Sequence, residues 1–413
     1  MRLSIPRGTV YHAVSDDLRG LLNVLYEKLD QEEIIAQWED KFAHYIGRNH
    51  SVAFPYARTA IYCSLKTQNL PAGSEIVMPP ITIKAILDAV LDLGLRPIFV
   101  DINIDTLCFD IEKLEQGIGV NTRAILITYL FGIVPNMDEI LSLCKKNNLF
   151  VIEDFSHCLN GRYKQKKLGC FGDVGVYSAS SIKTLDTYGG GLLVCDDDDL
   201  HLKLRKLQSG LEQPSRTHLV QKIITDLIRN VATSRLVFHF LVFPIIKIMS
   251  ALKMGSVIKH TGARDTKMIK ALPREWFKKY TSFQAKLGLT LLDSVENSDQ
   301  ARINNVALLK SKIRSLSFPR GVANTHNVYW QLVTFFDHST KIQNAMHAMG
   351  VDTATTSLDK ISTLSEYPFQ GDTPNADYLY GSGLFIPSFP SLSMKDLQYI
   401  SDVVNTTINN KIN

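Results

Sequence analysis

Short apolar runs alternate with helical patterns from about residue 47 to about residue 200. Four of these runs are predicted to be buried strands, namely Glu75–Met78, Pro97–Val100, Ala124–Tyr129 and Leu149–Ile152. Apolar residues at helical spacing predict helices between them over Ala85–Leu93 and Met137–Asn147. This alternation predicts an α/β fold with a mostly parallel central sheet and helices on both faces. Ligands in such sheets bind at the carboxyl ends of strands, where Asp101, Tyr129 and Asp154 fall.

The sequence outside this region predicts three further parts. A helix over Glu32–Gly47 precedes the alternation. We predict a large domain over 1–200, an apolar and basic helical insert over 201–274, and a helix over 275–300 that returns to the core. A small α+β C-terminal domain is predicted over 301–413, with a strand at Val328–Phe335 and helices at Lys341–Met349 and Met394–Ile408.

The insert contains the most apolar stretch of the chain, Leu219–Lys259. It carries six basic residues and one acid, and its longest uncharged run, Leu236–Ile246, is too short to span a bilayer. Two interpretations are open. The stretch is either a helical hairpin packed on the protein or on a second subunit, or an amphipathic segment that lies on an anionic membrane surface.

Composition and cysteine usage are those of an ordinary intracellular globular protein. The net charge of +4 over 413 residues does not indicate a nucleic-acid partner. None of the six cysteines has CxxC spacing, so we expect reduced, buried thiols and predict no metal site. The N-terminus lacks the apolar core of a signal peptide. These features predict a cytoplasmic protein, in contact with the inner face of the membrane if the second interpretation of the insert holds.

One lysine and one aspartate carry the strongest chemical signal. Asp154 ends an apolar run, and Lys183 follows 29 positions later among small hydroxyl residues, just before the glycine run Gly189–Gly191. Pyridoxal phosphate (PLP) chemistry needs a lysine amine to hold the aldehyde and a carboxylate to keep the pyridine nitrogen protonated. Ser178, Ser180 and Ser181 could donate hydrogen bonds to a phosphate group.

A second phosphate-binding element is predicted at Pro55–Ile61. This turn follows a short apolar run and precedes a predicted helix, so its small residues can offer backbone N–H groups and a positive dipole end to a phosphate. Within the turn, Arg58 next to Ala57 could supply a direct cation or could face solvent.

These segments together resemble the DegT/DnrJ/EryC1/StrS sugar aminotransferases, PLP enzymes of the aspartate-aminotransferase fold (fold type I). The similarity is collinear over more than 300 residues. It is carried by Glu39-Asp-Lys-Phe-Ala-His-Tyr-Ile-Gly47, Gly73-Ser-Glu-Ile-Val-Met-Pro-Pro-Ile-Thr82, Gly94-Leu-Arg-Pro-Ile-Phe-Val-Asp101, Tyr129-Leu-Phe-Gly132, Leu168-Gly-Cys-Phe-Gly-Asp-Val-Gly175 and Ile386-Pro-Ser388.

The resemblance implies a role for each candidate residue. Lys183 would hold the cofactor and shuttle a proton between substrate and cofactor carbons, and Asp154 would pair with the pyridine nitrogen. His157 stands where the family contacts the ring hydroxyl, and Ser178 where it binds phosphate. Ala57 and Arg58 occupy the phosphate turn of the family.

The chain departs from the family at three places opposite the lysine. Tyr56-Ala57-Arg58 stands where the family usually has Ser-Gly-Thr. Ile83 follows Thr82 where members often place an aromatic ring over the cofactor. Phe277-Lys278-Lys279 stands where the family has an asparagine that reaches the phosphate of the neighbouring subunit. Besides Arg58, the cations Lys84, Arg123, Lys278 and Lys279 are candidates for binding acidic substrates.

The resemblance implies a homodimer that transfers an amine from glutamate to a keto-sugar by a ping-pong mechanism, and we expect the keto-sugar to be nucleotide-linked. The product would enter surface polysaccharide or amino-sugar biosynthesis. An alternative from another class is a PLP-binding regulator or scaffold of a membrane-associated sugar-polymer assembly complex. A nicotinamide enzyme is disfavoured, because no GxGxxG follows the first strand.

Overall fold

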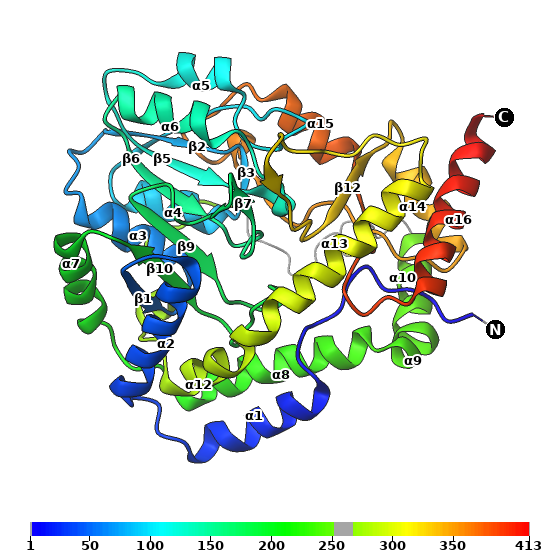
Figure 1. The fold of residues 1–413 in the computed structure, drawn as a ribbon, viewed down its shortest axis with the longest axis horizontal. Helices are drawn as coiled ribbons and strands as arrows, with labels where there is room; N and C mark the ends of the chain where they lie inside the picture. The colour runs from blue at the N-terminus through cyan, green and yellow to red at the C-terminus, as the bar shows by residue number, and fades with distance from the viewer. Residues whose placement is uncertain (1, 252–266, 413) are drawn as a thin grey trace.

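A seven-stranded sheet forms the centre of the larger part of the molecule. The computed structural model describes residues 2–251 and 267–412 (Figure 1). The strands follow the order β1-β10-β9-β6-β5-β2-β4, and β10 alone among the seven runs against the others. Their bounds are β1 (His50–Phe54), β2 (Glu75–Met78), β4 (Arg96–Phe99), β5 (Thr122–Thr128), β6 (Phe150–Asp154), β9 (Val174–Ser178) and β10 (Gly191–Cys195). The predicted mostly parallel sheet is confirmed.

Helices cover both faces of this sheet, and strand β5 shows why. Ile125 and Ile127 belong to one buried apolar cluster, whereas Ala124 and Leu126 belong to another on the opposite face. A strand that is apolar on both sides must be covered on both sides. The helices that pack around the sheet are α2 (Glu32–Ile46), α3 (Ala57–Thr67), α4 (Lys84–Asp92), α5 (Ile111–Gly117), α6 (Met137–Lys146) and α7 (Asp198–Ser209).

The end of α2 illustrates how local sequence sets an element. Trp38 and Phe42 are spaced to face the core and are fully buried. Gly47 then adopts φ of 96°, a left-handed conformation that ends the helix and that favours glycine. The predicted helix over Glu32–Gly47 is therefore confirmed. The six cysteines are also free and buried, as predicted.

A smaller unit packs beside the sheet and contains the C-terminus. Strand β12 (Leu332–Phe335) pairs antiparallel with β14 (Gly383–Ile386). Helices α14 (Ser339–Ala348) and α16 (Met394–Ile412) share an apolar cluster with these strands, and Ile5 from the N-terminal segment joins this cluster. The unit thus has the α+β character predicted for it, although its sequence boundaries stay a prediction.

The strand predicted over Val328–Phe335 is wrong in its first half. Tyr329 has φ of 51°, and the N–H groups of Val328 and Tyr329 both donate to the carbonyl oxygen of Gly132. This turn departs from the extended conformation, so the strand begins only at Leu332. The run resembled a strand because its large side chains are buried, as in Val328, or partly buried, as in Tyr329 and Trp330, although the backbone there forms a turn.

Helices make up the described part of the region between residues 198 and 312. They are α8 (Arg216–Thr233), α9 (Arg235–Val237), a π-helical turn (Phe238–Val242), α10 (Phe243–Ala251), a 3₁₀ turn (Arg274–Phe277), α12 (Ser282–Leu291), a 3₁₀ turn (Leu292–Ser294) and α13 (Val295–Lys312). Helix α8 lies beside α1 (Val14–Tyr26) below the sheet in Figure 1. The end of the stretch Leu219–Lys259, from residue 252 on, falls outside the described residues.

Short elements complete the fold. They are a 3₁₀ turn at Leu130–Gly132, another at Ile361–Thr363, β3 (Ile81–Thr82), β7 (Arg162–Tyr163), β8 (Lys166–Lys167), β11 (Thr325–His326), β13 (Asp359–Lys360) and α15 (Pro374–Ser382).

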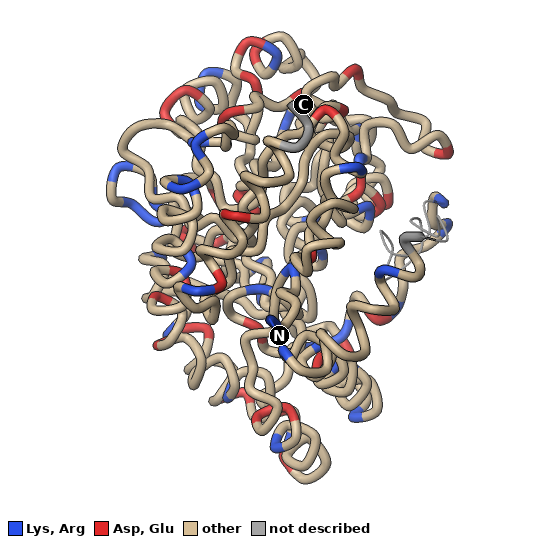
Figure 2. The backbone as a smooth tube through the Cα atoms, turned by 90° about the vertical axis from the view of Figure 1, so that its right-hand side faces the viewer, with Lys and Arg blue, Asp and Glu red and all other residues tan. Residues whose placement is uncertain are grey.

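We call residues 235–249 the apolar arm. One face of the arm packs on the protein through Phe238 and Phe243, both buried. The other face exposes large apolar side chains, namely Leu236, Phe240, Leu241, Ile245 and Ile248. The apolar arm is the helical segment that ends at the grey trace in Figure 2, and its charged residues are Arg235 and Lys247. Within the described residues, no single helix has the length and apolar character to cross a membrane. Only α8 and Arg235–Met249 taken jointly do, with a 65° bend between them.

Candidate active site

The predicted pair of Asp154 and Lys183 meets at the carboxyl ends of neighbouring strands. Asp154 is the last residue of β6, and Lys183 lies in the loop that leaves the adjacent strand β9. The two residues are only 8% and 9% exposed. Burial raises the pKa of the Asp154 carboxyl, while a bond from Ser156 and the charge of Lys183 act in the opposite direction. The two groups therefore interact electrostatically inside the protein.

The loop that carries Lys183 is held by its own backbone and by one aromatic residue. The N–H of Lys183 donates to the carbonyl of Ser180 at 3.1 Å, and Ile182 adopts a left-handed φ of 72°. The indole N–H of Trp330 donates to the carbonyl of Ile182 at 3.1 Å. The Nζ atom of Lys183 lies 4.2 Å from the centre of the Trp330 ring. Sequence reasoning missed Trp330, because no spacing or motif links it to the lysine.

His157 is fixed as a neutral ring beside the same pair. Its imidazole stacks on Trp330 with ring centres 4.1 Å apart and lies parallel to Phe131 at 6.1 Å. Burial, and then the charge of Lys183, lower the pKa of His157 well below its usual value. The N–H of Phe131 donates to Nδ1 at 3.2 Å, so the ring proton is carried by Nε2. His157 is therefore a hydrogen-bond donor through Nε2.

Two hydrogen bonds donated by backbone N–H groups join Asp154 to Ser178 through Ser156. The carboxylate of Asp154 accepts from the N–H of Ser156 at 3.0 Å, and the Oγ of Ser156 accepts from the N–H of Ser178 at 3.0 Å. The hydroxyls of Ser178 and Ser180 lie 2.9 Å apart. Ser178 is thus linked to Asp154 through Ser156, and its implied role in binding phosphate stays a prediction.

The predicted phosphate turn lies against the glycine run. A Cβ atom on Gly191 would be 2.4 Å from the N atom of Ala57 and 2.3 Å from the carbonyl carbon of Tyr56, so only glycine permits this approach. Ala57 begins helix α3, whose first N–H groups have no partner within the helix. The Arg58 guanidinium stacks on the rings of Tyr56, at 3.9 Å, and Trp276, at 4.6 Å. Its Nε is buried with no hydrogen-bond partner among the described residues.

Three of the other candidate cations, Lys84, Arg123 and Lys278, are engaged elsewhere. The Nζ of Lys84 bonds to Asp88 at 2.9 Å, and Lys278 forms an ion pair with Glu212 at 2.5 Å. Arg123 donates to a backbone carbonyl of its own turn at 2.8 Å. Of the side chains named as candidates for acidic substrates, Arg58 is the one that the structure places beside Ala57 and the glycine run.

Two residues at strand ends have structural contacts. Asp101 accepts from the backbone N–H of Ala376 at 3.0 Å at the start of α15. Tyr129 donates to Glu153 at 2.5 Å, and Glu153 also accepts from the N–H groups of Gly169, at 2.8 Å, and of residues 171 and 172. Position at a strand end therefore identifies candidates, and burial next to Lys183 separates Asp154 from the rest.

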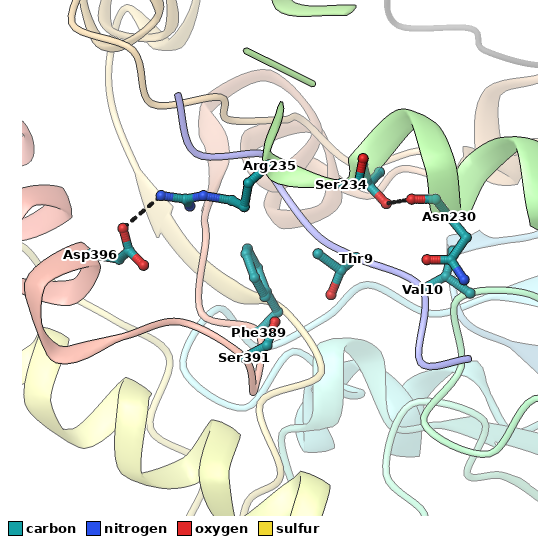
Figure 3. A pocket seen from close by; sticks show the side chains of 9 residues that line it. Thr9, Val10, Asn230, Ser234, Arg235, Phe389, Ser391 and Asp396 are labelled. Atoms are coloured by element: carbon teal, nitrogen blue, oxygen red, sulfur yellow. Dashed lines mark hydrogen bonds and ion pairs between the residues drawn. The ribbon is translucent and has the colours of Figure 1, made fainter. Parts of the chain in front are cut away.

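A separate pocket lies between the N-terminal segment, the end of α8 and the C-terminal unit. It encloses about 290 Å³ and is lined in part by Thr9, Asn230 and Phe389. Figure 3 shows Arg235 and Asp396 paired at its edge, at 2.8 Å. None of the residues that line it belongs to the Lys183 site.

Comparisons with known proteins agree with this site. The sequence model of the DegT/DnrJ/EryC1/StrS aminotransferase family matches residues 17–226 and 259–405. Among curated relatives, the GDP-perosamine synthase of Caulobacter vibrioides is 34% identical over 184 residues, which are 45% of this chain and 50% of that protein. The chain spans about half the length of the first curated relatives that it matches.

A further relative, and a solved structure among several, match over nearly the whole chain. The UDP-N-acetyl-3-dehydro-alpha-D-glucosamine 3-aminotransferase of Acidithiobacillus ferrooxidans is 25% identical over 90% of this chain and 87% of its own length. The structure of PseC from Helicobacter pylori, an aminotransferase involved in the biosynthesis of pseudoaminic acid, covers 99% of this chain and 100% of its own. It has a TM-score of 0.76 at 20% identity. This chain therefore belongs to the DegT/DnrJ/EryC1/StrS aminotransferase family, whose cofactor is PLP.

Proposed function

We propose that this chain is a PLP-dependent aminotransferase that moves an amine from glutamate to a keto-sugar, in surface polysaccharide or amino-sugar biosynthesis. The observation that carries the proposal is the buried pair of Lys183 and Asp154 at adjacent strand ends in a chain of this family. The names of the relatives, which include a GDP-perosamine synthase and a UDP-sugar 3-aminotransferase, support a nucleotide-linked sugar as substrate.

The residues present fit each polar group of PLP. Lys183 offers an amine for the aldehyde, Asp154 a carboxylate for the pyridine nitrogen, and His157 an Nε2–H for the ring hydroxyl oxygen. The start of α3 and the buried, unpartnered Nε of Arg58 suit the phosphate. When bound, PLP supplies an electron sink for the carbanion that forms when the substrate amine loses its α-proton.

Each of the side chains around Lys183 has its own role in the proposed reaction. With PLP bound, the Nζ of Lys183 would take up the proton that leaves the substrate carbon and give it back, and Lys183 is buried. The buried carboxylate of Asp154 would pair with the pyridine nitrogen and favour its protonated form. Trp330 and Phe131 orient His157 and exclude water from that side. Glutamate reacts first and the keto-sugar second, in a ping-pong sequence.

The experiment that tests the proposal is amino transfer itself. The protein, loaded with PLP, is incubated with glutamate and a panel of nucleotide-linked keto-sugars, and the products are identified by mass spectrometry. An amino-sugar and 2-oxoglutarate formed in equal amounts are expected. Absence of both products with every sugar, in a protein that binds PLP, would contradict the proposal.

The exposed face of the apolar arm favours a second candidate function. A PLP-binding regulator or scaffold of a membrane-associated sugar-polymer assembly complex would use Leu236, Phe240 and their neighbours as a docking surface. Stable binding of an assembly partner without amino transfer to any keto-sugar would favour this candidate over the enzyme.

We further propose a cytoplasmic homodimer that touches the inner face of the membrane through residues 219–259. Large apolar side chains are exposed on α1, including Leu18 and Leu22, and on the apolar arm. Exposed apolar patches of this kind support contact with a second subunit or with a membrane. Light scattering of the purified protein distinguishes a dimer from a monomer. Flotation with anionic vesicles tests the membrane contact, and Phe240→Ser with Leu241→Ser should abolish it without changing PLP binding.

A further inference from the structure

Two cations from different helices converge on one aromatic ring beside the glycine run. The Arg58 guanidinium carbon of α3 lies 3.9 Å from the centre of the Tyr56 ring, and the Nζ of Lys222 of α8 lies 4.5 Å from it. Both side chains are partly buried. Neither forms an ion pair with a carboxylate in the parts of the chain that the structure describes.

The Nζ of Lys222 points at the glycine run. A Cβ atom on Gly189 would lie 2.8 Å from this Nζ, so a side chain there would displace it. Gly191, two residues on, contacts the N atom of Ala57 and is opposite Ser178 in the register of β10 and β9. The ammonium group is therefore close to the start of α3 and to the end of β9.

The charge of Lys222 is only partly compensated, because Asp186 and Asp226 act on it without forming an ion pair with it among the described residues. Burial, and then the charge of Arg58, lower the pKa of Lys222 to about 8, although Asp186 and Asp226 act in the opposite direction. Burial also lowers the pKa of Arg58 to about 10. Two partly desolvated cations without a close counterion are costly unless an anion binds between them. A phosphate dianion has the charge and the oxygen atoms that such a pair requires.

We propose that Lys222 binds the phosphate group of PLP together with Arg58, and that α8 thus completes the cofactor site within a single chain. The inference rests on the proposed function, since it assigns one further residue to the same site. It also accounts for Phe277-Lys278-Lys279, which stands where the family has an asparagine that reaches the phosphate of the neighbouring subunit. A cation supplied in the same chain takes the place of that contact.

Helix α8 is already fastened to the loop that carries Lys183. The hydroxyl of Ser181 donates to the carboxylate of Asp226, and Arg229 donates to the same hydroxyl at 2.6 Å. Lys222 is one helical turn from Asp226, on the same side of α8. Phosphate binding at Lys222 would therefore stabilise α8 and the lysine loop together.

The test compares PLP with pyridoxal, which has the same ring and aldehyde but no phosphate. Dissociation constants of both are measured by absorbance titration of cofactor-free protein, for the wild type, Lys222→Met and Lys222→Arg. Lys222→Met should weaken PLP about 10- to 100-fold and leave pyridoxal unchanged, whereas Lys222→Arg should keep most of the PLP affinity. Lys203→Met, at an exposed lysine of α7, is the matched control and should change neither constant.

Each other outcome overturns the inference. Equal weakening of PLP and pyridoxal in Lys222→Met would assign a structural role to the lysine, and unchanged constants would assign none. If Lys222→Met no longer binds uridine diphosphate but still binds PLP normally, Lys222 binds the diphosphate of a nucleotide-sugar instead. If the wild type does not bind PLP, the proposed function is wrong as well as the inference. If the wild type binds PLP normally and only the Lys222 variants behave unexpectedly, the inference alone is wrong. If Lys222→Met does not fold, the PLP-to-pyridoxal ratio of Lys222→Gln, which keeps a polar side chain without the charge, decides in the same way.

Discussion

The Nζ atom of Lys183 lies 4.2 Å from the centre of the Trp330 ring, although the two residues are far apart in the sequence. Lys183 is in a loop of the sheet, and Trp330 lies just before the first strand of the C-terminal unit. The same indole stacks on His157 and donates to the carbonyl of Ile182. Trp330 is thus a positioning residue that holds both the catalytic loop and the neutral histidine.

Replacing this indole tests the positioning role. Trp330→Ala removes a cation–π contact and a hydrogen bond, so we expect kcat to fall about 10-fold or more. Trp330→Phe keeps an aromatic ring and should recover part of the rate without the bond to Ile182. The absorption spectrum of bound PLP should shift in Trp330→Ala, because His157 loses its stacking partner. Wild-type spectrum and rate in Trp330→Ala would remove this role.

The pair that carries the chemistry gives the sharpest substitutions. Lys183→Ala should abolish turnover while leaving the circular dichroism spectrum unchanged. Asp154→Asn should still bind PLP but lose about 100-fold or more of the rate, because the neutral amide cannot hold a proton on the ring nitrogen. Steady-state rates and PLP binding of the two variants measure this, and near-normal turnover in either would contradict the role given to that residue.

The neighbouring carboxylate should behave in the opposite way. Glu153 accepts from Tyr129 at 2.5 Å and from three backbone N–H groups, so it supports structure rather than chemistry. Glu153→Gln should lower the free energy of unfolding by about 3 kcal/mol. Its PLP spectrum and rate per folded molecule should stay near those of the wild type. A large loss of rate without a loss of stability in urea denaturation would contradict this division between Glu153 and Asp154.

PLP affinity should depend on pH through Lys222. Its pKa is about 8 in the cofactor-free protein, set by burial and by Arg58 against Asp186 and Asp226, with His218 one turn earlier on α8. The ammonium is charged below this pH, so the affinity contributed by Lys222 should be present near pH 7 and be lost as pH rises through about 8. The ratio of the pyridoxal dissociation constant to the PLP dissociation constant isolates this effect. In Lys222→Met this ratio should not change with pH over the same range.

Protein stability should also fall at alkaline pH, through a different group. The pKa of His12 is about 9 in the folded state. Burial alone would lower this pKa, but the hydrogen bond to Asp17 and the charge of Asp186 raise it. A folded pKa above the usual 6.5 gives stability that is complete below pH 6.5 and is lost as pH rises through about 9. The contribution is about 3 kcal/mol. Thermal unfolding between pH 6 and 10 measures it, and His12→Gln should lose this pH dependence.

Some of the site follows from local sequence and some does not. Asp154 could be predicted because an apolar run that ends in an acid places a carboxylate at a strand end, and Lys183 because a glycine run follows it. Trp330 and Lys222 could not be predicted, since each reaches the site from a distant segment through tertiary packing. The turn at Tyr329 was missed for the same reason, because its backbone bonds go to Gly132 rather than to a strand.

The central claim is that Lys183 and Asp154 form a working PLP site for amino transfer. The most direct measurement is the absorption spectrum of the purified protein with PLP, before and after glutamate is added and again after a keto-sugar is added. The account predicts a visible band of bound PLP that glutamate removes and a nucleotide-linked keto-sugar restores, with no such band in Lys183→Ala. A wild-type protein that takes up no PLP, or a band that glutamate leaves unchanged, would contradict it.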